Sequence, residues 1–513
     1  MAVSDDRKFT RAQVYALLEG IKGLTLGEVD SSGQFVRAQK SSKITGIAGD
    51  VIEQSVFGYA RDSRQECDIE IDGVLTELKT TGVRIPKKDL SKAIGKVGNE
   101  YNLYLGAKEG ISITGVTFDP EIQLDFFSSH FGEKSEHLLI VFYEYRSYDI
   151  VPASGYKHFP VVGYCYNTFS EVEVSQLRHD WEIVRDYLKQ VYAVSADTND
   201  RNEHLQGFTH ILRPELLLIE LVPGFKKKVT GAYQKPRYRL KQTFVDYIVR
   251  GHFNKKRAKH EINLREPFSS FAELDERCRA LTKLYGGKSL GQLMRELDIT
   301  SKRPIKNLSA LCIIKMFGAD CNRLNLIADF TKAGIIAKTI TLKPDGKRTE
   351  DMKLNRIDFE EWTDRDRDFE ESDIYVYFCE HSFLCPVFCE HDSSDCLKTT
   401  FEGFKRFAFD EVFLEKEVRR VWEDSRNLIY RNELRWIYNL SPSGEYVKNK
   451  SGSYKGAPNF PKSSDYTVFF RGGNLDSSER ERTECVNGIN MLPQYYWLKG
   501  SFIATKLKSL PFL

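Results

Sequence analysis

The sequence predicts an α/β protein made of two consecutive copies of one domain, each a mixed β-sheet flanked by helices. Apolar runs rich in β-branched and aromatic residues, such as 137–145, predict buried strands. Amphipathic stretches such as 8–22 predict helices between them. The second half of the chain repeats short motifs of the first half in the same order, which indicates a duplicated domain.

The segment 66–82 predicts a tight β-hairpin that gathers charged side chains. An Asp-Gly pair at 72–73 lies between alternating apolar and polar residues, and Asp-Gly favours a two-residue turn with positive φ at both positions. Closing that turn places Asp68 opposite Glu77. Because side chains repeat every two residues along a strand, Lys79 shares a face with Glu77.

Two carboxylates and a lysine on one patch are typical of a metal-dependent hydrolase. The like charges of Asp68 and Glu77 would repel one another unless a cation lay between them. Carboxylates with a backbone carbonyl and waters are the ligands that Mg²⁺ takes, and a neighbouring lysine can orient an attacking water. The alternative is a solvated hairpin face with incidental charges.

Composition restricts the class of protein without naming a function. The 513 residues are enough for two or three domains. The balance of 75 basic and 73 acidic residues argues against a general polyanion binder. No apolar run reaches the ~20 residues of a membrane span, and the first residues show no apolar signal segment. Ten cysteines without a regular framework suit a reducing cytoplasm.

Two further stretches of the first half carry candidate functional residues. Residues 47–58 have apolar positions at helical spacing, and Glu53 lies on this predicted helix shortly before the hairpin. Residues 223–250 are locally basic, and tyrosines are interleaved with their lysines and arginines. That combination suits contacts with phosphates and bases, and the alternative is a solvated basic surface.

The repeat is visible as ordered pairs of motifs. A polar, charged stretch at 250–264 predicts a linker between the copies. The paired segments are GLTLGEV (23–29) and GKSLGQL (287–293), IVFYEY (140–145) and YVYFCE (375–380), HILRP (210–214) and VFFRG (468–472), and YRLKQTF (238–244) and YWLKGSF (496–502).

The copies differ at the charged positions. This alignment places Ile313 where the first copy has Glu53, and Ile336 where it has Glu77. Asp329 and Lys338 remain, but one carboxylate and one lysine make a poor metal site. The second copy is therefore predicted to keep the fold without catalysis.

Taken in order, these motifs resemble the MutH family. They are a helix with Gly49-x-x-x-Glu53, then Asp68, then Glu77-x-Lys79, then a basic segment ending in Tyr-x-Leu-Lys-x-Thr-Phe. MutH is a mismatch-repair nicking endonuclease, and its type II restriction-enzyme relatives cut at GATC. The restriction branch carries two MutH-like domains, the second without its acids. The resemblance implies a restriction-endonuclease-like fold, with a catalytic domain at 1–255 and a degenerate DNA-binding or regulatory domain at 262–513.

Carried over position by position, the resemblance implies specific site residues. Glu70 stands at the MutH spacing from Glu77 and is a rival to Asp68 as the first metal ligand. The implied catalytic residues are Glu53, Asp68, Glu77, Lys79 and Lys134; the implied Mg²⁺ ligands are Asp68, Glu77 and the Leu78 carbonyl; the implied DNA-binding residues are Arg213, Tyr238 and Lys241 in the first copy, with Arg471 and Lys499 in the second.

The expected function is that of a type II restriction endonuclease. It would hydrolyse double-stranded DNA at GATC with Mg²⁺ and leave 5′-phosphates. The expected form is a monomer that dimerises or loops on DNA, without contact with a membrane. One alternative is a mismatch-repair-type nicking endonuclease, which the doubled length disfavours. The other is an inactive DNA-binding regulator, which the intact acids of the first copy disfavour.

A cysteine- and histidine-rich segment at 379–396 offers a second chemistry. It holds four cysteines and two histidines, and tetrahedral zinc takes four such ligands, often as closely spaced cysteine pairs. Only Cys385 and Cys389 have such spacing. Buried strand and hairpin cysteines are therefore the favoured interpretation, with zinc as the alternative.

Overall fold

The computed structural model describes two compact units. One comprises residues 1–277 and 314–337, and the other comprises 278–313 and 338–513. These units do not follow the boundaries of the sequence repeat, so the division at 255 and 262 stays a prediction. Residues outside the description are 1–6, 40–45, 60–65, 118–123, 148–150, 196, 198, 199, 202, 206–210, 223, 225–233, 255–260, 301–306, 349, 366, 450, 451, 453 and 474–477.

The first unit is built on a mixed sheet in the order β1-β2-β3-β6-β7, with β4 beside β3. Its β1–β2 and β3–β6 pairs are parallel, and the other pairs are antiparallel. Strand β6, between β3 and β7, is almost entirely buried because its sequence is a continuous apolar run. The strands are β1 (Lys8–Phe9), β2 (Ile69–Ile71), β3 (Val74–Arg84), β4 (Gly106–Ala107), β6 (His137–Glu144) and β7 (Val161–Thr168).

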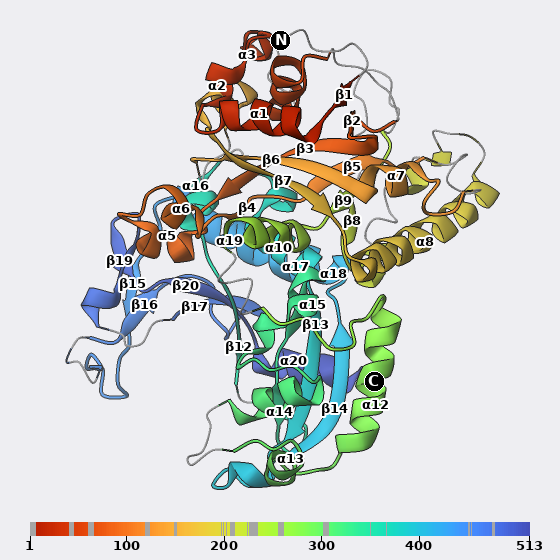
Figure 1. The fold of residues 1–513 in the computed structure, drawn as a ribbon. Coiled ribbons are helices and arrows are strands. Elements are labelled where there is room, and N and C mark those ends of the chain that lie inside the picture. Colours follow the sequence, from red (N-terminus) through yellow and green to blue (C-terminus); the bar gives the residue numbers. More distant parts are fainter. Residues whose placement is uncertain are drawn as a thin grey trace. The chain divides into compact units, whose positions relative to one another are not determined.

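Helices α1, α2 and α3 cover one face of this sheet (Figure 1). Val14, Leu18 and Leu26 of these helices pack with Leu139 and Val141 of β6 in one buried cluster. On the other face, the ring of Phe142 lies 5.3 Å from that of Phe253 at the end of α10. The helices near this sheet are α1 (Arg11–Ile21), α2 (Leu26–Val29), α3 (Gln34–Gln39), α4 (Ile47–Val51) with the π-helical η1 (Ile52–Val56), α5 (Lys87–Ala93), α6 (Gly98–Asn102), α7 (His130–Glu136), η2 (Ala153–His158) and α10 (Gln242–Phe253).

A second, three-stranded antiparallel sheet in the order β5-β9-β8 completes the first copy. Asp180 links the long helix α8 to the start of β8. Its buried carboxylate accepts the N–H groups of Leu217, Leu218 and Ile219 at 2.8–3.1 Å. The elements are β5 (Ile111–Gly115), α8 (Glu171–Val194), η3 (Arg213–Glu215), β8 (Ile219–Val222) and β9 (Arg237–Leu240).

Segments from the start of the second copy belong to the first unit. The Lys332 ammonium lies 3.1 Å from the Glu173 carboxylate of α8, and both side chains are buried. Asp329 accepts the N–H of Leu264 at 2.7 Å. These segments are η4 (Leu324–Leu326), α15 (Ala328–Lys332) and β10 (Ile335–Ala337), and α14 (Leu308–Met316) crosses the division between the units.

The second unit repeats the strand order of the first. Strand β13 pairs in parallel with β11 and antiparallel with β14, as β6 does with β3 and β7. A separate antiparallel sheet has the order β12-β20-β17, which corresponds to β5-β9-β8. The strands of the second unit are β11 (Ile340–Leu342), β12 (Met352–Arg356), β13 (Ser382–Cys389), β14 (Thr400–Phe407), β15 (Trp436–Tyr438), β16 (Gly456–Pro458), β17 (Val468–Gly472), β18 (Glu484–Val486), β19 (Ile489–Met491) and β20 (Gln494–Leu498).

Two of the predicted motif pairs are wrong. Residues 375–380 lie in a helix, Asp373–Glu380 (α17), and the strand equivalent to β6 is β13, which follows this helix. Arg471 lies on β17, whose counterpart is β8, whereas Arg213 lies on the short 3₁₀ helix η3. The pair YRLKQTF and YWLKGSF is confirmed as equivalent, because each runs from the middle strand of a three-stranded sheet into a helix.

The helices of the second unit complete the α/β architecture. They are α12 (Phe271–Tyr285, shared with the first unit), α13 (Leu290–Glu296), α16 (Phe359–Thr363), η5 (Phe369–Glu371), α17, η6 (Cys396–Lys398), α18 (Glu411–Phe413), the π-helical η7 (Leu414–Val418), α19 (Arg419–Tyr430), η8 (Glu479–Glu481) and α20 (Gly500–Lys508). The predicted fold class, α/β with mixed sheets flanked by helices, is confirmed.

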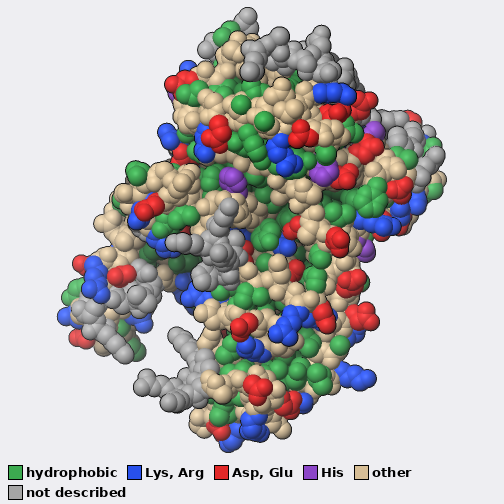
Figure 2. Space-filling model, in the orientation of Figure 1, with side chains coloured by type: hydrophobic (Ala, Val, Ile, Leu, Met, Phe, Trp, Pro, Cys, Tyr) green, Lys and Arg blue, Asp and Glu red, His purple; other side chains and the backbone are tan. Residues whose placement is uncertain are grey.

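Surface chemistry agrees with the balanced composition. On the face shown in Figure 2, basic and acidic side chains are interspersed. Within the described part of the chain, no helix has both the length and the apolar character needed to span a bilayer. All ten cysteines are free thiols.

Candidate active site

The predicted hairpin forms and delivers Asp68 to the cluster. Its turn has φ of 50° at Asp72 and 82° at Gly73, as a two-residue turn with both residues left-handed requires. The β2–β3 ladder ends at Ile69 opposite Thr76. Asp68 therefore lies just beyond the ladder, where its Oδ2 accepts the N–H of Leu78 at 2.9 Å.

Glu77 is the centre of the site. Its carboxylate is 1% exposed and lies 2.6 Å from Lys79 Nζ. Lys134 Nζ lies 3.0 and 3.1 Å from the two Glu77 oxygens. Lys134 comes from α7, which leads directly into β6, and β6 pairs in parallel with β3 so that Glu77 is opposite Leu138. This pairing brings together two side chains that are 57 residues apart.

Glu53 reaches the same cluster from a π-helical turn. Residues Ile52–Val56 form this turn directly after α4, and such turns occur frequently at functional sites. Burial raises the pKa of Glu53 to about 7, and the Asp68 and Asp50 carboxylates act in the same direction. Glu53 is thus close enough to the other acids to be repelled by them.

The cluster holds more negative than positive charge. Burial raises the pKa of Asp68, and the Glu77 carboxylate raises it further. Burial alone would lower the pKa of Lys79, but the carboxylates of Glu77, Asp68 and Glu53 outweigh burial and raise it. The acids Glu53, Asp68 and Glu77 are therefore only partly compensated by Lys79 and Lys134.

The available donors fit a hard divalent cation. Asp68 is partly exposed. The N–H and C=O of one strand residue point to the same side, and the Leu78 N–H is bonded to Asp68. The Leu78 carbonyl therefore faces the Asp68 side of β3. Carboxylate and carbonyl oxygens are the ligands that Mg²⁺ prefers, with waters filling the remaining positions.

The structure separates Glu70 from this cluster. Glu70 lies within β2 opposite Leu75, and its carboxylate is 3.2 Å from Lys8 Nζ. Asp68, in contrast, is bonded to Leu78 and electrostatically coupled to Glu77. The geometry therefore favours Asp68 as the first ligand.

Sequence reasoning missed Tyr59 as a neighbour of the site. Its side chain is mostly buried, and burial raises its pKa, with the Asp68 and Glu53 carboxylates adding to the effect. The Arg7 guanidinium lies 4.3 Å from the centroid of its ring. Neither residue belongs to a recognisable motif, and only the folded chain brings them to the acids.

The predicted DNA-binding residues lie in different environments. Tyr238 is 0% exposed and Lys241 is 2% exposed, and Lys241 Nζ donates to the Leu216 carbonyl at 2.5 Å. Both side chains are thus inside the first unit and not at its surface. Arg213 and Lys499 are partly exposed, and Arg471 is exposed. Much of the basic stretch, residues 225–233, lies outside the described residues.

The charged residues that remain in the second copy do not rebuild this site. Asp329 is 3% exposed and its carboxylate caps the backbone at Leu264. Lys338 is partly buried; burial lowers its pKa, and the nearby Lys353 lowers it further. A lysine whose pKa is lowered by a neighbouring lysine differs sharply from Lys79 beside Glu77.

The Glu53 environment predicts a pH-dependent stability in the metal-free protein. A carboxyl whose pKa rises from 4.5 in the unfolded chain to about 7 in the folded chain favours folding while it is protonated. The free energy of unfolding should therefore fall as the pH rises from about 4.5 to 7. Glu53→Gln should reduce that fall, measured by denaturant unfolding in a chelating buffer across this range. An unchanged pH dependence in Glu53→Gln would refute the assignment, and Glu19→Gln, at an exposed position, serves as the control.

Two comparisons with known proteins identify sequences similar to this chain. Residues 57–180 match the family model of the DNA mismatch repair enzyme MutH. This range includes Asp68, Glu77, Lys79 and Lys134 and begins just after Glu53. The chain is also 23% identical over 418 residues to the type II restriction enzyme Sau3AI of Staphylococcus aureus, which covers 77% of this chain and 75% of that enzyme. The resemblance to the MutH-like family of type II restriction endonucleases is thereby confirmed.

Proposed function

We propose that this chain is a type II restriction endonuclease that hydrolyses both strands of DNA with Mg²⁺. The observation that carries the proposal is the buried Glu77 carboxylate between Lys79 and Lys134, with Asp68 beside it. Like-charged acids in so compact a cluster are costly for folding alone. Their conjunction with two lysines supports a site made for a metal ion and a phosphate.

The metal would be held by Asp68, Glu77 and the Leu78 carbonyl. When bound, a divalent ion supplies stabilisation for the charge that develops on the scissile phosphate and the departing 3′ oxygen. Glu77 is almost fully buried, so its position is fixed before substrate arrives. Such preorganisation reduces the reorganisation needed during reaction.

The other residues of the cluster would act on water and phosphate. Lys79 orients the attacking water and stabilises its deprotonated form. Lys134 holds Glu77 in place through its 3.0 Å contact, and Glu53, with a pKa of about 7, is suited to exchange a proton with solvent. Attack in line with the 3′ oxygen leaves a 5′-phosphate and a 3′-hydroxyl.

The recognition sequence GATC is supported by the family resemblance. In the first copy, Arg213 is the predicted DNA-binding residue with a partly exposed side chain. The buried Tyr238 and Lys241 would contribute indirectly, by fixing the junction of β9 and α10 inside the first unit.

The second copy would bind DNA without cutting it. One face of the β12-β20-β17 sheet carries the accessible side chains of Lys353, Tyr495, Trp497 and Arg471. Lys353 Nζ lies 3.4 Å from the centroid of the Tyr495 ring, and the Arg471 guanidinium lies 4.8 Å from that of a Trp497 ring. Basic groups interleaved with aromatic rings suit phosphate contact and base stacking. A second DNA segment held there would favour a cleavage-competent assembly.

Catalysis should depend on Lys79 and not on Lys338. Lys79→Ala should reduce cleavage by at least roughly 100-fold, because the group that orients water is lost, while DNA binding is retained. Lys79→Arg keeps a cation beside Glu77 and should preserve stability, yet a planar guanidinium should not restore activity. Lys338→Ala is the matched control and should cut normally. Single-turnover cleavage with circular dichroism on each variant measures this; an inactive but folded Lys338→Ala would contradict it.

The products should identify both the site and the reaction. Incubation of unmethylated genomic DNA with Mg²⁺ should give double-strand breaks whose sequenced ends share GATC and carry 5′-phosphates. Ends without a shared GATC would overturn the specificity but not the nuclease. A supercoiled plasmid converted only to the nicked form would favour a nicking endonuclease, and DNA that is bound but left intact would favour a regulator.

A role for the second copy should appear as a preference for two sites. The full chain should cut a two-site plasmid faster than a one-site plasmid, with the rate rising with enzyme concentration. Arg471→Ala should remove this preference and leave one-site cutting intact. Arg480, whose side chain is 77% exposed in the same unit, provides the control Arg480→Ala. Equal wild-type rates on both plasmids would exclude such a role.

A further inference from the structure

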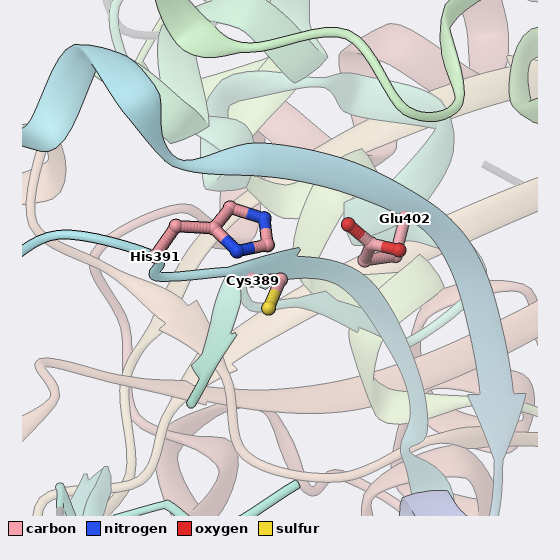
Figure 3. A group of neighbouring side chains, drawn as sticks. All are labelled: Cys389, His391 and Glu402. Atoms are coloured by element: carbon pink, nitrogen blue, oxygen red, sulfur yellow. The ribbon is translucent and has the colours of Figure 1, made fainter. Parts of the chain in front are cut away.

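Three metal-ligating side chains converge in the second unit at the end of the β13–β14 pair where residues 390–399 connect the two strands. Cys389 ends β13, His391 follows it, and Glu402 lies on β14 (Figure 3). One ligand atom from each lies within 4.8 Å of the other two. The three are not part of the acidic cluster around Glu77, and Cys389 and His391 come from the segment whose sequence offered zinc as an alternative.

A β-bulge brings Glu402 into this group. Val387 is opposite Gly403 and Phe388 is opposite Phe401, so Glu402 is the extra residue between them. A bulge redirects side chains locally and is common near functional sites. Cys389 is opposite Thr400, two residues from Glu402. The strand irregularity thus places the carboxylate beside a thiol and an imidazole.

Hydrogen bonds prepare His391 as a ligand. The Thr400 hydroxyl donates its one proton to Glu402 Oε1 at 2.5 Å. At its 2.9 Å contact with His391 Nε2, the hydroxyl must therefore accept. Nε2 then carries the hydrogen of the neutral ring, and the lone pair is left on Nδ1. A histidine whose second ring nitrogen is held in this way is the usual form of a metal ligand.

We propose that Cys389, His391 and Glu402 form a zinc site, with a water in the fourth position. Sulfur, imidazole nitrogen and carboxylate oxygen are the ligand types that Zn²⁺ takes, at about 2.0–2.3 Å in tetrahedral geometry. Tetrahedral bonds of that length put ligand atoms about 3.3–3.8 Å apart. The three side chains need to close by roughly 1 Å, which accessible side chains at the end of a strand pair can do by rotation.

Charge favours zinc over the catalytic Mg²⁺ at this place. A thiolate and a carboxylate together balance a divalent cation, whereas Mg²⁺ binds oxygen ligands and not thiolate. Zinc binds cysteine as the thiolate, so binding at Cys389 should release a proton. Of the nearby cysteines, Cys385 is fully buried within β13 and is outside the ligand group.

The test uses the full chain, stripped of metal and kept in excess Mg²⁺ so that the acidic cluster is occupied. Titration with Co²⁺ should give one equivalent bound, with a thiolate-to-cobalt charge-transfer absorption that Zn²⁺ abolishes by displacement. Cys389→Ser should lose this absorption. His391→Ala and Glu402→Gln should each weaken Zn²⁺ binding by more than ~100-fold, and Thr400→Val by ~10–100-fold, the range for a residue that orients a ligand.

Matched controls make each outcome decisive. Cys485→Ser removes an exposed thiol of the same unit and should bind cobalt as the wild type does. Zn²⁺ should raise the Tm of the wild type and of Cys485→Ser but not of Cys389→Ser, and circular dichroism confirms that each variant is folded. The proposal is overturned if the wild type shows no charge-transfer absorption, if Cys389→Ser keeps it, or if His391→Ala and Glu402→Gln bind zinc normally.

Discussion

The ion pairs of the Glu77 carboxylate, which is 1% exposed between Lys79 and Lys134, are the interactions on which the geometry of this charged cluster depends. A buried carboxylate without a partner is costly, and removing one member of a buried ion pair typically costs about 3–5 kcal/mol. Lys79 is on the same strand, but Lys134 is on α7. The parallel register of β3 and β6, with Glu77 opposite Leu138, brings the end of α7 and its Lys134 next to Glu77.

Around this ion pair, the remaining acids are held against their mutual repulsion. Glu53 has a pKa of about 7 because it is buried near Asp68 and Asp50. The pKa of Asp68 is also raised, by burial and by the Glu77 carboxylate. The apolar core of the unit, with Val51 and Ile52 at 0% exposure, supplies the stability that tolerates this arrangement. Strain that is concentrated at one place and offset elsewhere is typical of functional sites.

The second unit shows which features the fold needs and which it does not. The order β11-β13-β14 and the order β12-β20-β17 repeat those of the first copy, and both depend on buried apolar strands such as β13. The acids of the Glu77 cluster have no counterpart in that packing, so their replacement in the second copy leaves the sheets intact. Charged and thiol groups at the ends of β13 and β14 are then available to bind a different metal ion.

Local patterns determined a large part of the first unit. The Asp-Gly turn fixed the β2–β3 hairpin, and the two-residue repeat put Glu77 and Lys79 on one face, because both depend only on neighbouring residues. The apolar run at 137–145 specified β6 because a strand buried on both faces has to be apolar throughout. The α/β class and the duplicated strand–helix block at 238–244 and 496–502 follow from the same short-range signals.

Tertiary structure alone decided what depends on distant partners. The segment 375–380 is a helix although its residues favour a strand, since packing overrides local preference. Lys241 is buried against the Leu216 carbonyl, which no charge pattern could reveal. Lys134 and Glu402 join their clusters through strand register and a β-bulge, and Tyr59 reaches the acids from the chain that follows the π-helical turn. Each of these is set by how the elements pack together, and periodicity within a single segment carries no information about it.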